Sequence, residues 1–100
     1  MADEPRLTLP SLKILRTLLE DPMQPLAGVD IHKRAHVSTG TLYPILLRLE
    51  AAGWLQSAWE AIDPAEAGRP RKRFYRLTPT GLVRAGEAIA SLGGEAPTWA

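Results

Sequence analysis

The sequence predicts a mostly α-helical (α+β) fold with elements in the order helix, helix, helix, strand, strand, helix. Apolar residues recur at helical spacing in several segments. Two short segments of alternating pattern flank a loop rich in proline and glycine. Helix-capping residues stand at the expected boundaries. Three helices, a two-stranded hairpin and a C-terminal helix are the arrangement of a winged helix-turn-helix, in which the hairpin is the wing.

Composition is that of one small globular domain. The chain has 100 residues, of which 45% are hydrophobic and 23% are charged. We expect the domain to span residues 8–92, between an N-terminal tail (1–7) and a flexible C-terminal tail (93–100). No cysteine occurs, which excludes a disulfide scaffold and fits a cytoplasmic location. No apolar run could span a membrane, and the N-terminus lacks the features of a signal peptide.

The first two helices are predicted over 8–20 and 27–35. Thr8 can cap the first helix, and Asp21 followed by proline ends it. In the second helix, Val29 and Ile31 are expected to lie partly inward, with Lys33 outward.

The third helix follows a short turn and begins at Ser38, which we expect to accept a hydrogen bond from a free backbone N–H of the first turn. Gly53 should end this helix in a left-handed conformation. Pro44 lies inside the helix and predicts a bend or a loosened first turn. The residues at helical spacing that should form its buried stripe are Leu42, Ile45, Leu46 and Leu49.

The wing is predicted from strands at 54–61 and 71–77, joined by a loop at 62–70. Two strands alone are marginally stable, so the hairpin must pack on the helices. Trp54 and Trp59 are expected to pack beneath it. Thr78 should cap the last helix, with Pro79 at its first position.

Charge is unevenly distributed, although the net charge is only +1. The segments 31–49 and 67–86 contain basic residues and no acidic ones. Five of the eight residues from Arg69 to Arg76 are basic. Such separation predicts a positive face on a nearly neutral protein.

Several separated motifs, in the right order, resemble the PadR family of transcriptional regulators. They are T-L-Y-P at 41–44, R-L-E at 48–50, W-E at 59–60 and R-K-R-F-Y-R-L-T at 71–78. The resemblance covers roughly residues 12–92. It implies a winged helix-turn-helix homodimer that binds palindromic operators, usually as a repressor, with the third helix in the major groove. The long C-terminal helical region of larger members is missing, as in the compact subgroup.

Candidate contacts to double-stranded DNA come from the second helix, the third helix and the wing. Hydroxyl groups at the start of a helix suit phosphates and base edges, and guanidinium and ammonium groups suit phosphates. A solubilising basic loop is the alternative for the wing, and packing is the alternative for Tyr43. The candidates are Lys33, Ser38, Thr39, Thr41, Tyr43, Arg48, Arg69, Arg71, Lys72 and Arg73.

A second copy of the chain is the other expected partner. The stripe of the last helix is more apolar than covering a hairpin requires, and Ala85 is small enough for close helix approach. The alternative is that the stripe packs only within its own subunit. The predicted interface residues are Leu12, Leu15, Leu82, Ala85, Ile89 and Leu92.

Other functions find little support. No catalytic serine, histidine and acid arrangement and no glycine-rich phosphate loop occur, so no enzyme and no cofactor are expected. His32 and His36, even with Asp30, make a poor metal site without cysteine. Compact PadR members can carry an aromatic-lined cavity at the dimer centre, which leaves a hydrophobic small-molecule effector open. Trp99 is either a remnant of the tail or a residue that docks on a partner subunit.

Two function classes therefore remain. The first is a sequence-specific DNA-binding transcriptional regulator, acting as a repressor. The second is a winged-helix module whose basic wing binds an acidic partner protein. The salt dependence of DNA affinity separates them.

Overall fold

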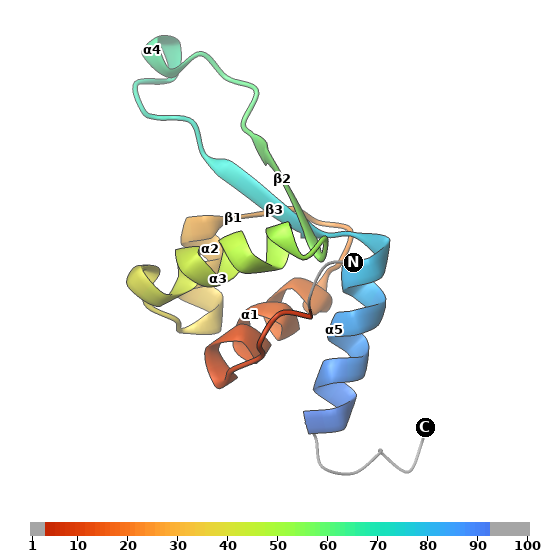
Figure 1. Cartoon of the computed structure of the whole chain (residues 1–100). Helices are drawn as coiled ribbons and strands as arrows, with labels where there is room; N and C mark the ends of the chain where they lie inside the picture. The colour runs from red at the N-terminus through yellow and green to blue at the C-terminus, as the bar shows by residue number, and fades with distance from the viewer. Residues whose placement is uncertain (1–3, 93–100) are drawn as a thin grey trace.

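A computed structural model describes residues 4–92 and confirms the predicted winged-helix fold with two additional elements (Figure 1). The predicted elements all form, with slightly shorter strands. The additions are a two-residue strand before the second helix and a short helix in the wing. In chain order the elements are α1 (Leu9–Glu20), β1 (Leu26–Ala27), α2 (Gly28–Ala35), α3 (Thr39–Ala51), β2 (Leu55–Trp59), α4 (Pro64–Ala67), β3 (Arg73–Leu77) and α5 (Pro79–Leu92).

The sheet has three antiparallel strands in the order β1-β3-β2, so β3 is central. Leu26 pairs with Tyr75, and Ser57 pairs with Tyr75 from the other side. The sequence predicted only the hairpin. The third strand was missed because two residues are too few to show an alternating pattern, and it forms where the free edge of β3 can accept it.

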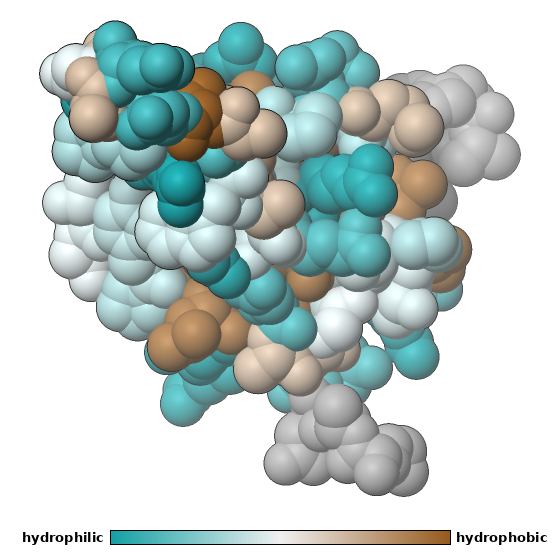
Figure 2. Space-filling view, turned by 90° about the horizontal axis from the view of Figure 1, so that it is seen from above, coloured by the Kyte–Doolittle hydropathy of each residue, from teal (hydrophilic) through white to brown (hydrophobic). Residues whose placement is uncertain are grey.

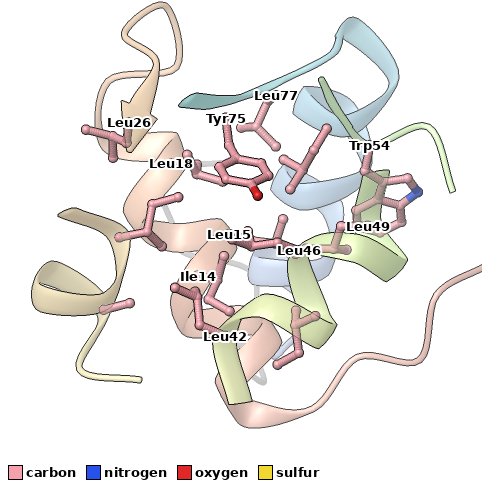
Figure 3. Packing of buried hydrophobic residues seen from close by; sticks show 14 of the residues in the cluster. Ile14, Leu15, Leu18, Leu26, Leu42, Leu46, Leu49, Trp54, Tyr75 and Leu77 are labelled. Atoms are coloured by element: carbon pink, nitrogen blue, oxygen red, sulfur yellow. The ribbon is translucent and has the colours of Figure 1, made fainter. Parts of the chain in front are cut away.

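The core lies between α1, α3 and β3. Ile14, Leu15 and Leu46 are fully buried, and in Figure 3 the side chains of α1 and α3 converge beneath those of β3. Tyr75 and Leu77 contribute from the sheet and Trp54 from the start of the hairpin, which ties the wing to the helices. The predicted stripe of α3 is buried as expected: Leu42, Ile45, Leu46 and Leu49.

Most predicted helix boundaries are confirmed by local hydrogen bonds. The Thr8 hydroxyl accepts a hydrogen bond from the backbone N–H of Ser11. Gly53 has a φ of +82°, the left-handed conformation that ends a helix without steric strain. The prediction for Ser38 was partly wrong: it occupies the capping position but accepts no backbone N–H, and its hydroxyl donates to the hydroxyl of Thr41 at 3.2 Å. α3 runs through Pro44 to Ala51.

The turn between α2 and α3 is closed by side chains. His36 takes a left-handed conformation with a φ of +56°. Nδ1 of His32 lies 2.6 Å from the Val37 carbonyl oxygen, which can only accept, so Nδ1 carries the proton. The Lys13 ammonium donates to the His36 carbonyl at 3.2 Å. These bonds set the position at which α3 begins.

The start of α5 is joined to the end of α3 through Thr78. Its hydroxyl donates to the Gly53 carbonyl at 2.6 Å and accepts from the Gly81 N–H at 2.9 Å, which confirms the predicted cap. The backbone N–H of Thr78 donates to the Trp54 carbonyl. Gly81 packs directly on that carbonyl, and an added β-carbon would lie 1.9 Å from its oxygen. Only glycine fits there.

Several predictions of detail are corrected. Trp59 is 59% exposed, so it does not pack beneath the wing as Trp54 does. Val29 is also exposed, because the inward face of the short α2 is occupied by Ile31 and Ala35. Residues 64–67 form helix α4 within the predicted loop, since Asp63 caps them through the Ala65 N–H. The predictions about the C-terminal tail and Trp99 concern positions outside the described residues.

The β2–β3 hairpin projects well beyond the helices and carries α4 at its tip, whereas α5 descends along α1 on the other side (Figure 1). Seen from the wing side, the surface is mainly hydrophilic with smaller hydrophobic areas between (Figure 2). Among the described residues, no helix has the length and hydropathy needed to cross a membrane.

Candidate nucleic-acid interface

The face of α3 opposite its buried stripe is open to solvent. Thr39, Thr41, Tyr43 and Arg48 are all exposed on it, and Ser38 is exposed just before the helix begins. Leu47 is 69% exposed on the same helix. The predicted contact residues of α3 are therefore all accessible on this helix of 13 residues.

Tyr43 both packs and remains accessible. It is 45% exposed, yet an added β-carbon on Gly28 would lie 2.6 Å from its hydroxyl oxygen. The ring therefore rests against the first residue of α2, where the absence of a side chain makes room for it. Both interpretations of this tyrosine, packing and surface contact, describe part of its environment.

A groove of about 430 Å³ lies between this tyrosine and the outer end of the paired wing strands. Its floor and walls combine aromatic rings with basic side chains. It is lined by Ala27, Gly28, Val29, Tyr43, Trp59, Arg71, Lys72, Arg73 and Tyr75. Burial raises the pKa of the Tyr75 phenol, which stays neutral at physiological pH. The groove thus presents cationic groups on its wing side and no carboxylate in its lining.

The wing tip is organised by one ion pair. Arg69 donates from two nitrogens to the two carboxylate oxygens of Glu60, at 2.8 and 2.9 Å. Glu60 also accepts from the backbone N–H of Lys72 at 3.2 Å. The Arg69 hydrogen bond, followed by the smaller effect of Lys72, lowers the pKa of Glu60 from 4.5 to about 2. Arg69 therefore supports the wing tip, and its role as a phosphate contact stays a prediction.

The other wing cations, Arg71, Lys72 and Arg73, differ in whether a carboxylate lies near them. Arg71 donates to the Ile62 carbonyl at 3.0 Å and makes no ion pair within the described part of the chain. The side chain of Lys72 is exposed and makes no ion pair with residues 4–92. The guanidinium carbon of Arg73 lies 4.9 Å from the centre of the Trp59 ring, and its Nη2 lies 3.9 Å from Oε2 of Glu50. Lys72 and Arg71 are thus the most available wing cations.

The helices contribute three further cations. Lys33 and Arg34 are exposed in the last turn of α2, and Arg48 is exposed on α3. None of them forms an ion pair within the described part of the chain. The sequence had predicted Lys33 and Arg48 as contacts, but it did not predict the pairing of Glu60 with Arg69 or the stacking of Arg73 on the exposed Trp59 ring. The signal for both contacts in the sequence was the pair Trp59-Glu60 on one predicted strand, opposite the basic run on the other.

The predicted dimer residues divide into two groups. Leu12, Leu15 and Ala85 are 8%, 0% and 0% exposed, so they belong to the core of the single chain and leave little surface for a partner. Leu82 is 42% exposed and Ile89 is half-buried. Leu92 ends α5, and its side chain is outside the described part.

An additional apolar surface lies on α5, between its inner face and its polar face. Residues three or four positions apart share a face of a helix. Leu82 and Val83, 42% and 60% exposed, fall on the same side as the exposed Gly86 and Ala90. The predicted stripe was therefore displaced by about a quarter turn from the surface that is actually free.

Comparison with known proteins decides the family. The model of the transcriptional regulator PadR-like family matches residues 14–87, which contain α2, α3 and the whole wing. The chain belongs to the PadR-like family. This confirms the resemblance found in the motifs and the prediction of a transcriptional regulator rather than an enzyme.

Relatives of known name agree with this assignment. The chain is 47% identical over 70 residues to transcriptional regulator Rv3488 of Mycobacterium tuberculosis, covering 62% of this chain and 61% of that protein. A PadR-like transcription factor from Bacteroides fragilis has a similar structure, with a TM-score of 0.67 and 30% identity over 84% of this chain and 80% of the other.

A structure of overoxidized AbfR bound to DNA is also similar. AbfR is a protein of Staphylococcus epidermidis. The TM-score is 0.64 and the identity is 28%, with 86% of this chain and 60% of that chain covered. The winged-helix fold of this PadR-like chain is thus shared with a protein that has been seen on DNA.

Proposed function

We propose that this PadR-like chain is a sequence-specific DNA-binding repressor that acts as a homodimer on a palindromic operator. One arrangement carries the proposal: the open face of α3 lies beside a groove whose far wall is the basic side of the wing. A winged helix uses these two surfaces together, the helix in the major groove and the wing on the backbone.

Under this proposal, Thr39, Thr41 and Tyr43 read or approach the bases from α3, and Ser38 contacts a phosphate at the start of the helix. All four are exposed. Hydroxyl groups can bond both to base edges and to phosphates, but only base contacts carry sequence information.

Positioning on the backbone falls to the exposed cations Lys33, Arg48, Arg71 and Lys72. Their charges are not compensated by carboxylates among the described residues, so they are available to replace counterions of the duplex. Arg69 and Arg73 have partners of their own and act mainly on the shape of the wing.

The proposed dimer joins two copies through the free apolar side of α5 that contains Leu82 and Val83. Such a surface is costly to leave in water, and the small residues Gly86 and Ala90 beside it permit close approach of a second helix. Two-fold pairing places two α3 helices roughly 34 Å apart, one turn of the duplex. A dimer bound over a promoter represses by occupying it.

The decisive experiment measures binding to duplex fragments from the region beside the protein's own gene at several salt concentrations. We expect one fragment to bind more tightly than random DNA. Its affinity should fall with salt at a log–log slope of about −0.9 per neutralised phosphate. A flat salt response, or no fragment bound at low salt, contradicts the proposal and favours a module that binds an acidic protein.

A further inference from the structure

A chain of side-chain contacts joins the last turn of α3 to both strands of the wing. The Ser57 hydroxyl on β2 donates to Oε2 of Glu50 on α3 at 2.6 Å. The Ser57 hydroxyl oxygen in turn accepts from Nε of Arg73 on β3 at 3.0 Å. One hydroxyl group therefore connects three elements, and Glu50, Ser57 and Arg73 are all partly buried.

The geometry leaves Ser57 little choice of orientation. A serine hydroxyl has one proton, which Ser57 donates in its hydrogen bond to the Glu50 carboxylate. A lone pair of the same hydroxyl oxygen is left to accept from the Arg73 guanidinium. Hydrogen bonds to charged groups are stronger than neutral ones, and both bonds of this hydroxyl are of that kind. The direct contact between Nη2 of Arg73 and Oε2 of Glu50 is long, at 3.9 Å, and partly exposed. It is therefore weaker than the two hydrogen bonds through Ser57.

Arg73 passes this constraint on to the outer wing. Its guanidinium lies over the Trp59 ring, and the two residues are paired in the register at the outer end of the hairpin. The next residue toward the tip is Lys72, whose carbonyl accepts from the Glu60 N–H. Arg73, which Ser57 orients, is therefore the last paired residue of β3 before the groove cations Lys72 and Arg71.

We infer that Ser57 is a positioning residue for DNA binding, because its hydroxyl holds Arg73 and the wing at a set angle to α3. The inference rests on the proposed function. Ser57 itself does not contact DNA; it decides where Lys72 and Arg71 meet the backbone relative to the reading face of α3. Loss of the hydroxyl should leave charge and fold unchanged but let the wing swing away from that position.

The strand offers a matched control. Gln56, the neighbouring residue, accepts a hydrogen bond from Nε of Arg76 at 3.0 Å, so it also binds an arginine of β3. Successive strand residues face opposite sides of a sheet, so Gln56 points away from the side on which Ser57 meets Glu50. Ser57→Ala and Gln56→Ala thus remove similar bonds on the two sides of one strand.

The test measures operator affinity, its salt slope and the indole N–H resonance of Trp59, which a Trp59→Phe variant assigns. We expect Ser57→Ala to bind roughly fivefold to tenfold more weakly, the effect of one lost hydrogen bond, with a shallower slope. The Trp59 resonance should shift in the free protein. Ser57→Thr, which keeps the hydroxyl, should restore all three, and Gln56→Ala should change none.

The outcomes separate this inference from the function on which it rests. If the unmodified chain binds no DNA, the proposed function fails and the inference fails with it. If it binds DNA but Ser57→Ala and Gln56→Ala behave alike, only the positioning role is overturned. A Ser57→Ala loss that Ser57→Thr does not reverse also overturns it, since the hydroxyl would then not be the cause.

Discussion

Arg69 and Glu60 face each other across the wing tip through two parallel hydrogen bonds of 2.8 and 2.9 Å. Residues nine positions apart are thereby joined around α4, and the tip is a closed loop rather than a loose connection. The pair also gives one of the five cations of the basic run a carboxylate partner. Its strength can be measured through the titration of Glu60.

We expect Arg69→Gln to raise the pKa of Glu60 from about 2 toward 4.5, because the hydrogen bond from Arg69 is the largest cause of the depression. The folded pKa lies below the unfolded value, so the stabilisation by this pair is complete above about pH 4.5 and is lost as pH falls toward 2. Carboxyl chemical shifts followed by NMR report the titration. Arg71→Gln is the control, since Arg71 does not contact Glu60; an equal shift in both variants would contradict the assignment.

Gly81→Ala should strongly destabilise the fold, by about 3 kcal/mol or more, because its β-carbon would meet the Trp54 carbonyl oxygen at 1.9 Å. That oxygen belongs to the backbone and accepts the Thr78 N–H, so it cannot move away cheaply. Gly86→Ala on the same helix meets nothing of its own chain within 4 Å, so the folding of the single chain should gain about 0.5–1 kcal/mol. Urea unfolding of both variants checks this, and equal stabilities would refute the packing described at Gly81.

Contacts from α3 and from the wing should separate on mutation. Lys72→Ala should weaken operator and random DNA alike and reduce the salt slope by about 1, because its charge acts on phosphates. Thr39→Ala should cost about 1–3 kcal/mol on the operator alone if the hydroxyl meets a base. Parallel titrations with operator and with random DNA measure both effects. An equal loss of affinity of Thr39→Ala for the two kinds of DNA would contradict α3 as the element that reads the sequence.

Val83→Glu should dissociate the proposed dimer without unfolding the chain, because Val83 is 60% exposed on the apolar side of α5. A charge buried at the interface of two copies would be unpaired and costly. Thr80→Glu places the same charge on the exposed polar side of that helix and should change nothing. Solution mass at micromolar concentration, together with circular dichroism, checks both. A native chain that is already monomeric would dismiss the dimer.

Ile89→Glu tests the boundary between core and interface. Ile89 is half-buried, at the edge between the inner face of α5 and its free apolar side. Unfolding of this variant would assign the residue to the monomer core, whereas a folded monomer would assign it to the interface. Ala85→Glu should unfold the chain in either case, since Ala85 is fully buried.

The sequence by itself determined the helices, their ends and the family. Helix ends depend on residues close in the sequence, so they can be predicted without the rest of the chain. The examples are the caps Thr8 and Thr78 and the left-handed Gly53. The apolar period identified the buried side of α3 for the same reason, because helical spacing alone decides which residues share a face.

Only the tertiary structure decided which of the candidate residues are free to act. Arg69 is engaged because the hairpin register brings Glu60 opposite it, and Arg73 because Ser57 and Glu50 meet it from two other elements. Leu12 and Ala85 are core because α1 and α5 pack on each other. β1 exists because β3 had an unpaired edge. Each of these depends on groups distant in the chain, whose meeting no local pattern encodes.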